Sequence, residues 1–235
     1  CPSPVWRQWL LVFWCFPLSV AAAQPRSGIS YAGADVRAMQ ADDFANPGML
    51  WVTRGEKIWQ IPAGRDNKSC ADCHQNAAVS MRGVAARYPQ VDGAGQVINL
   101  EGRINSCRGQ RQGAEPLRYE SEELLALTAF VAYQSRGMPV QAVDGPVAKA
   151  ALERGRVTYY QRQGQMNLAC THCHERNVGK RLLAETISEG HGNAYPAYRL
   201  EWQTLGSLKR RLRTGTVVTT DDRNWELRHS LSVLR

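Results

Sequence analysis

The 235-residue sequence has no long hydrophobic run after its first 23 residues. A membrane-spanning helix needs roughly 20 apolar residues, so we expect no membrane span in the mature protein. No stretch alternates apolar and polar residues convincingly, which argues against a fold built on sheets. No RNA- or DNA-binding motif accompanies the formal charge of +8. We therefore expect no nucleic-acid partner, and rank an acidic protein, small anions or a merely solvated basic surface above it.

One apolar run does occur, at the N-terminus, and it has the pattern of a secretory signal. Arg7 precedes WLLVFWCFPLSVAAA, which ends in small residues, so cleavage is expected near Ala23. The run is short and contains a proline, which disfavours a membrane anchor. The sequence thus predicts a signal peptide at 1–23 and an exported mature chain.

Five cysteines remain after residue 23, and this odd number cannot pair completely within the chain. Four of them form the motifs CADCH at 70–74 and CTHCH at 170–174. C-x-x-C-H is the attachment signature of c-type haem, because two thiols can form thioethers with the porphyrin and the next histidine can ligate its iron. The sequence therefore predicts two covalently bound haem c groups, held by Cys70, Cys73 and His74 and by Cys170, Cys173 and His174.

Other readings of the motifs are possible. A CxxC pair alone is more often typical of a zinc or redox site, and two pairs could form one zinc site with four cysteine ligands. The histidine after each pair favours haem. His172 is expected to be an exposed bystander, and His191 and His229 to be structural or solvated.

The segments before the two motifs also match each other. RGEKIWQIPAGRDNKSC begins at Arg54 and RGRVTYYQRQGQMNLAC at Arg154, an offset of 100 residues. This self-similarity predicts two tandem copies of one domain, joined near Gly145-Pro146. We expect a mostly α fold with an N-terminal extension at 24–46, a first cytochrome c-like domain at 47–143 and a second, incomplete at its C-terminus, at 144–235.

Three helices are predicted in these copies. Each copy is expected to start with a helix, from about Pro47 to Trp59 and from about Val147 to Arg162. The first copy also ends in one, in SEELLALTAFVAYQSRG, with Ser121 as its cap and Gly137 as its stop. Candidate core positions on the helix after residue 147 are Leu152, Val157 and Tyr160.

A haem iron with one histidine needs a second axial ligand or stays open. The candidates are Met138, in RGMP, and the lone thiol of Cys107, in LEGRINSC; an inert buried cysteine is the plain alternative. Aligning 100–107 with LKRRLRTG at 208–215 pairs Cys107 with Gly215. The second copy therefore lacks the equivalent thiol.

The twin motifs, the GRINSC element and the closing AFVAYQSRGMPV resemble the SoxA family, the dihaem cytochrome c subunits of thiosulfate-oxidising complexes. The likeness runs from about Ala41 to Arg213, and HGNAYPAYRLEWQTLGSLKRRLR is similar to that family's approach to its active site. The resemblance implies a periplasmic L-cysteine S-thiosulfotransferase subunit that pairs with a SoxX-type monohaem cytochrome c. It also implies that thiosulfate is coupled oxidatively to a cysteine of a SoxYZ-type sulfur carrier, with electrons leaving through haem.

The same resemblance assigns residues. It implies His74 and Cys107 as the iron ligands of the first haem, His174 as a ligand of the second, and Arg211 as the arginine that guides substrate. The family's catalytic cysteine maps to Gly215, so no catalytic residue is expected in the chain as written.

The likeness stops abruptly after Arg213, and the tail TVVTTDDRNWELRHSLSVLR has no helical period. A shifted reading frame is the favoured explanation, and natural divergence is the other. Two further functions stay open: a non-catalytic dihaem electron carrier, which the missing thiol favours, and a dihaem peroxidase, for which the haem motifs are the sole support.

Overall fold

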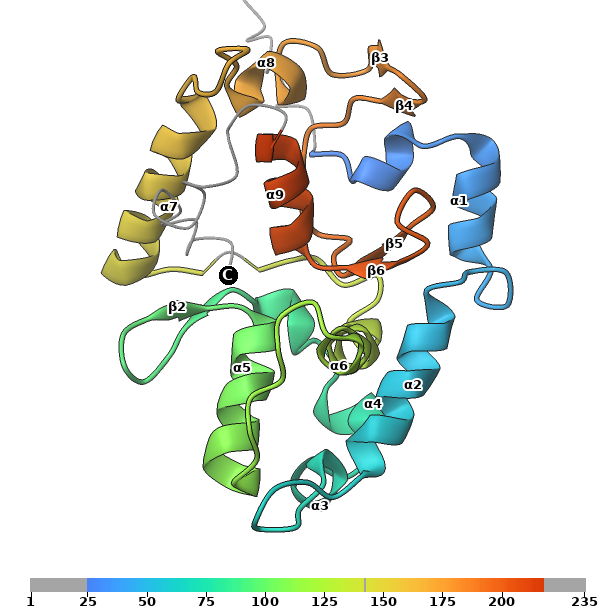
Figure 1. The fold of residues 1–235 in the computed structure, drawn as a ribbon, viewed down its shortest axis with the longest axis vertical. Helices are drawn as coiled ribbons and strands as arrows, with labels where there is room; N and C mark the ends of the chain where they lie inside the picture. The colour runs from blue at the N-terminus through green and yellow to red at the C-terminus, as the bar shows by residue number, and fades with distance from the viewer. Residues whose placement is uncertain (1–24, 142, 218–235) are drawn as a thin grey trace, which may run out of the picture.

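The computed structural model describes residues 25–141 and 143–217, and the fold is mostly helical, as predicted (Figure 1). The predicted signal peptide, His229 and most of the divergent tail lie outside the described residues. None of the helices in the described part of the chain combines the length and apolarity needed to span a bilayer.

The segment before residue 142 is built around two crossed helices, α2 (Met49–Gln60) and α6 (Glu122–Tyr133). The predicted helix starts and ends are confirmed to within a few residues. The Ser121 hydroxyl accepts the amide of Leu124 at 3.3 Å and so caps α6, while Gly137 follows the helix with φ +75°. Between these two helices the chain forms α3 (Cys70–His74), α4 (Ala77–Ser80), η2 (Ala85–Arg87), α5 (Leu100–Cys107) and η3 (Arg108–Gln112).

The core of this segment lies where α6 meets its neighbours. Every residue of α6 from Leu124 to Val131 is buried, so this stretch contacts other elements on several sides. Its one polar residue, Thr128, donates to the Leu124 carbonyl. One cluster joins Phe130 and Val131 to Trp59 of α2 and to Leu100 of α5. This cluster also contacts Cys70, which places the first CxxCH motif against the core.

After residue 143 the chain forms α7 (Pro146–Tyr160), α8 (Cys170–His174) and α9 (Leu208–Val217). The prediction of core positions on α7 was wrong. Leu152, Val157 and Tyr160 are 66%, 54% and 52% exposed, whereas the small residues Ala148 and Ala151 are buried. The helix therefore contacts its surroundings through its alanine face, where neighbouring backbone can approach closely, and leaves its large side chains outside.

Two antiparallel hairpins lead into α5 and α9. The hairpin β1 (Gln90–Val91) and β2 (Val97–Ile98) precedes α5, and β5 (Ala197–Arg199) and β6 (Thr204–Gly206) precede α9. Each following helix is capped by the residue before it: Asn99 accepts the amide of Gly102 at 2.8 Å, and Ser207 accepts the amide of Arg210 at 3.1 Å. Because Leu100 and Leu208 both start a helix, the alignment of 100–107 with 208–215 holds in three dimensions.

The sequence repeat also has a local structural counterpart. The backbone bridge between Ala63 and Lys68 recurs between Gln163 and Leu168. Asn67 and Asn167 both adopt positive φ, at 46° and 48°, and α3 and α8 follow at the same interval. The tight turn before each CxxCH helix therefore has the same backbone structure in both copies.

Two features of the chain ends bear on the site. The predicted extension forms η1 (Gly28–Tyr31) and α1 (Ala34–Ala41). The residues around η1 bond the loop that follows the hairpin of β3 (Arg181–Leu182) and β4 (Glu185–Thr186), at the upper end of the view in Figure 1. At the other end, α9 continues through Gly215 to Val217. The helix therefore runs four residues beyond the point where the likeness to the family stops.

Candidate haem sites

The first CxxCH motif forms the short helix α3, and its start is fixed by a reciprocal cap. The Ser69 hydroxyl accepts the amide of Asp72 at 3.1 Å, and the Asp72 carboxylate accepts the amide of Ser69 at 2.7 Å. These bonds hold the pKa of Asp72 below its ordinary value. Because the helix is fixed, Cys70 and Cys73 lie one turn apart and His74 follows them directly.

Cys107 lies at the end of α5, near the first motif. Burial is the main cause that raises the pKa of the Cys70 thiol; Arg108 opposes the rise and Cys107 adds to it, so the Cys107 side chain is within electrostatic range of Cys70. His74 is next to Trp59, with ring centroids 5.6 Å apart. The structure therefore places Cys107 within range of Cys70, and places His74 beside Trp59 of the adjoining core.

Met138, the other candidate ligand in this segment, lies at the edge of the fold. It is 39% exposed, and its sulfur is 3.4 Å from the position that a Cβ on Gly83 would take. The helix that ends at Cys107, in contrast, packs through Leu100 and Ile104 against the same core cluster as Cys70, which supports Cys107 as the candidate beside the first motif.

The second motif, in α8, uses a different cap. His172 stands where Asp72 stands in α3, and its Nδ1 accepts the amide of Ala169 at 3.0 Å. His172 is half-buried, so the expectation of an exposed bystander was wrong: it is a capping residue. Tyr159, the counterpart of Trp59, lies close to Cys170, and burial is the main cause that raises its pKa to about 12.

His174 is oriented by the loop that follows β4. Its Nδ1 lies 2.8 Å from the carbonyl oxygen of Ser188. A carbonyl can only accept, so Nδ1 carries the proton and Nε2 keeps the lone pair that a metal would take. A ligating histidine in proteins is ordinarily held in this way, and the residues present fit the haem that the motif predicts.

The positions of the cysteines also exclude the alternative of one zinc site shared by the two CxxCH motifs. All five cysteines within the described residues are free thiols, so none is consumed by a disulfide. Among the described residues, no group of three or more histidine, cysteine or acidic side chains could hold a metal ion. Figure 1 shows α3 and α8 at opposite ends of the long axis of the molecule. Four cysteines from the two motifs therefore cannot surround one zinc ion.

The cations of α9 point in different directions. Arg211 lies 3.7 Å from the carboxylate of Glu185 and shares a helix face with Gly215, four residues later. Lys209 lies over the ring of Tyr119 at 5.1 Å, and Arg210 lies over the ring of Trp202 at 4.4 Å. Of these cations, Arg211 is the one on the face of Gly215.

A cavity of about 240 Å³ lies between α9 and the loop before α6. Its lining is Arg118, Tyr119, Glu120, Lys209, Arg210 and Arg213. Glu120 is bound to the start of α9, because its carboxylate accepts hydrogen bonds from the hydroxyl and amide of Ser207. Arg118 belongs to no sequence motif and reaches α9 only through the tertiary fold, so it was not among the predicted site residues.

Comparison with known proteins gives a consistent picture. The model of the SoxA/TsdA cytochrome c domain family matches residues 54–140. The L-cysteine S-thiosulfotransferase subunit SoxA of Pseudaminobacter salicylatoxidans is 41% identical over 208 residues, which is 84% of this chain and 72% of that protein. The subunit of the same name from Rhodovulum sulfidophilum is 40% identical over 190 residues, 80% of this chain and 66% of that protein.

The fold agrees with the sequence matches. The crystal structure of SoxXA from P. pantotrophus superposes with a TM-score of 0.80 and 30% identity, covering 89% of this chain and 81% of that one. Since the match to the P. salicylatoxidans subunit spans most of both chains, the chain belongs to the SoxA family of L-cysteine S-thiosulfotransferase subunits, and its cytochrome c domain is of the kind that binds haem c covalently.

Proposed function

We propose that this chain is the dihaem cytochrome c subunit of a periplasmic thiosulfate-oxidising complex. It would pair with a SoxX-type monohaem cytochrome c and serve the oxidative coupling of thiosulfate to a cysteine of a SoxYZ-type sulfur carrier. The carrying observation is the pair of CxxCH helices, each with a histidine next to the second cysteine, in a chain 41% identical to a SoxA subunit. The complex named SoxXA among similar structures supports the partner.

Two haem groups are proposed, one for each motif. When bound, each would supply an iron centre that accepts and passes single electrons. Cys70 and Cys73 would tether the first and His74 and Cys107 would ligate it; Cys170, Cys173 and His174 would hold the second. The orientation of His174 by the Ser188 carbonyl supports the second assignment.

The basic side chains of α9 suit a small divalent anion. Arg211 faces the same side as Gly215, and its ion pair with Glu185 is long and exposed, so exchange for an anionic substrate costs little. The cavity on another side of α9, which Lys209, Arg210 and Arg213 line with Arg118 opposite, would raise the local concentration of anions. Arg211 would then orient thiosulfate by charge-assisted hydrogen bonds.

A second candidate function follows from one position. Gly215 occupies the place in α9 that Cys107 occupies in α5, counted from the capped starts of the two helices. A chain without a thiol there would transfer electrons between periplasmic partners without forming the sulfur–sulfur bond itself. This favours a non-catalytic dihaem electron carrier as the alternative.

The deciding experiment is made on the exported protein with its partner cytochrome and carrier. Mass spectrometry counts the haem groups, with two expected per chain, and an electron paramagnetic resonance spectrum shows whether one has a thiolate ligand. Thiosulfate coupling to the carrier cysteine is then measured. No coupling, with both haems present and reducible, supports the electron carrier; rapid coupling by the chain as written contradicts the assignment of Gly215 to the catalytic position.

A further inference from the structure

The loop at 188–193 lies between β4 and β5, and its side-chain hydrogen bonds within the loop join Gly190 to Ser188 and His191 to Glu189. Its residues belong to neither of the flanking hairpins. The Ser188 carbonyl nevertheless has to hold His174, and the loop passes very close to that ring: a Cβ added to Gly190, at φ +79°, would lie 2.9 Å from His174. The position of the loop therefore decides the position of the histidine.

Contacts from the far end of the sequence hold this loop. The Tyr31 hydroxyl donates to Oε1 of Glu189 at 2.7 Å, and the backbone amide of Arg26 donates to Oε2 at 3.0 Å. The Asn193 amide donates to the Ser27 hydroxyl at 3.2 Å. We call Arg26, Ser27 and Tyr31 the N-terminal clamp.

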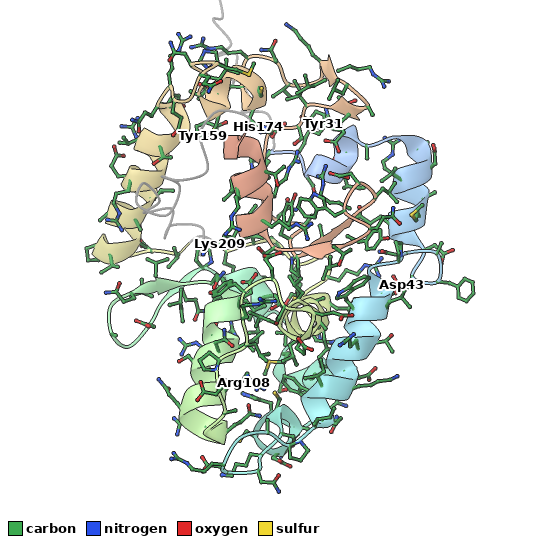
Figure 2. The ribbon with its side chains drawn as sticks, viewed as in Figure 1. Tyr31, Asp43, Arg108, Tyr159, His174 and Lys209 are labelled. Atoms are coloured by element: carbon green, nitrogen blue, oxygen red, sulfur yellow. The ribbon has the colours of Figure 1, made fainter. Side chains whose placement is uncertain are left out.

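Glu189 is central to the clamp. Its side chain is 28% exposed, and His191 also donates to Oε2, at 2.9 Å. Both carboxylate oxygens are thus occupied, and each hydrogen bond goes to the charged form, which is the stronger kind. Figure 2 shows Tyr31 and His174 at the same end of the molecule.

We propose that the N-terminal clamp, acting through Glu189, positions the His174 ring for its haem, with Tyr31 and Glu189 as positioning residues. The chain of contacts runs from Tyr31 to Glu189, along one peptide unit to Ser188, and from its carbonyl to Nδ1 of His174. A firm hydrogen bond at Nδ1 makes the imidazole a stronger electron donor at Nε2. The N-terminal extension would thereby change the reduction potential of the second haem. This effect rests on the proposed function, in which a second haem is bound.

A second tyrosine–carboxylate bond in the protein provides a control for the clamp. Tyr133 donates to Asp43 at 2.8 Å, which is also a tyrosine–carboxylate bond that ties the extension to the body of the protein. Asp43 lies after α1, and Tyr133 is in α6, so this bond does not reach the His174 loop. Tyr31→Phe and Tyr133→Phe therefore remove the same chemical group from two places, and only one of them belongs to the clamp.

The test uses the full holoprotein with these two variants. Hydrogen exchange of the backbone amides at 188–193 is measured by mass spectrometry, and the reduction potential of each haem by redox titration. For Tyr31→Phe we expect exchange in this loop to quicken about tenfold or more, as loss of a bond to a charged group implies. We also expect the potential of the His174 haem to rise, because a weaker donor favours the oxidised iron less. Tyr133→Phe should change neither.

Other outcomes overturn the proposal. Unchanged exchange at 188–193 in Tyr31→Phe, or an equal increase in both variants, shows that the clamp does not hold the loop. Faster exchange with an unchanged potential shows that the loop does not position His174. If the wild-type protein carries one haem, the second haem and the effect on its potential are refuted. The hydrogen-exchange data would still test whether the clamp holds the loop. Should Tyr31→Phe fold poorly, Glu189→Gln, which keeps one acceptor oxygen, should show the same two changes to a smaller degree.

Discussion

Gly55 of α2 lies directly against the backbone of Ala126 in α6: a Cβ on Gly55 would be 2.1 Å from the Ala126 carbonyl oxygen. No side chain fits there, so the two helices touch backbone to backbone at the centre of the first segment. Since α6 supplies most of the apolar core of that segment, the whole packing depends on this contact.

We therefore expect Gly55→Ala to destabilise the protein by about 3 kcal/mol or more, at the upper end of what overpacking costs. Gly109→Ala is the matched control, because Gly109 is also helical but has nothing within 4 Å of an added Cβ. It should be neutral or stabilising by about 0.5–1 kcal/mol. Urea unfolding followed by circular dichroism compares the two. Equal stability of the variants would disprove the close contact.

Replacing Cys107 should change the haem held at α3. If its thiolate is the second ligand of the proposed first haem, Cys107→Met removes negative charge from the iron and raises the reduction potential. The low-spin thiolate signal in electron paramagnetic resonance should disappear at the same time. Met138→Leu should leave both properties unchanged. A reduction potential that changes in Met138→Leu but not in Cys107→Met, with no thiolate signal in the unchanged protein, would make Met138 the ligand.

Restoring a thiol in α9 should restore coupling activity if the complex is otherwise intact. We expect Gly215→Cys to couple thiosulfate to the carrier cysteine at least about 100-fold faster than the unchanged chain, as expected for a covalent nucleophile. Thr216→Cys is the control: it adds a thiol one residue further on, five positions after Arg211, and that position does not share the helix face of Arg211. Similar rates for both variants would argue against position 215 as the catalytic one.

Acid should release the N-terminal clamp. Hydrogen bonds from the Arg26 amide, Tyr31 and His191 lower the pKa of Glu189 from 4.5 to about 2. Because the folded pKa is the lower one, the stabilisation is complete above pH 4.5 and is lost as the pH falls towards about 2. Other carboxylates titrate in this range too, so the comparison is with Glu189→Gln.

The wild type should lose protection from hydrogen exchange at 188–193 between these two pH values, whereas Glu189→Gln should show little further change there. The same loss in both proteins would mean that another group controls the loop.

Local sequence patterns were sufficient for the helices and the motifs. Caps such as Ser121, stops such as Gly137 and the CxxCH spacing act over a few residues, so they can be read without the fold. The equivalence of Cys107 and Gly215 also came from aligned sequence, and the two capped helix starts agree with it. The short hairpins were not predicted, since two or three residues per strand leave no alternation to detect.

The tertiary structure decided what lies far apart in the chain. Leu152, Val157 and Tyr160 have helical spacing, yet α7 buries its alanines, because the partner surface rather than the spacing selects the buried face. Arg118 has no motif, and neither Tyr31 nor Glu189 stands near a cysteine; their roles arise from contacts between distant segments. The sequence by itself thus determined which residues are the candidates for holding haem. Folding alone decided which neighbours orient them, because a hydrogen bond across 158 positions depends on the path of the whole chain.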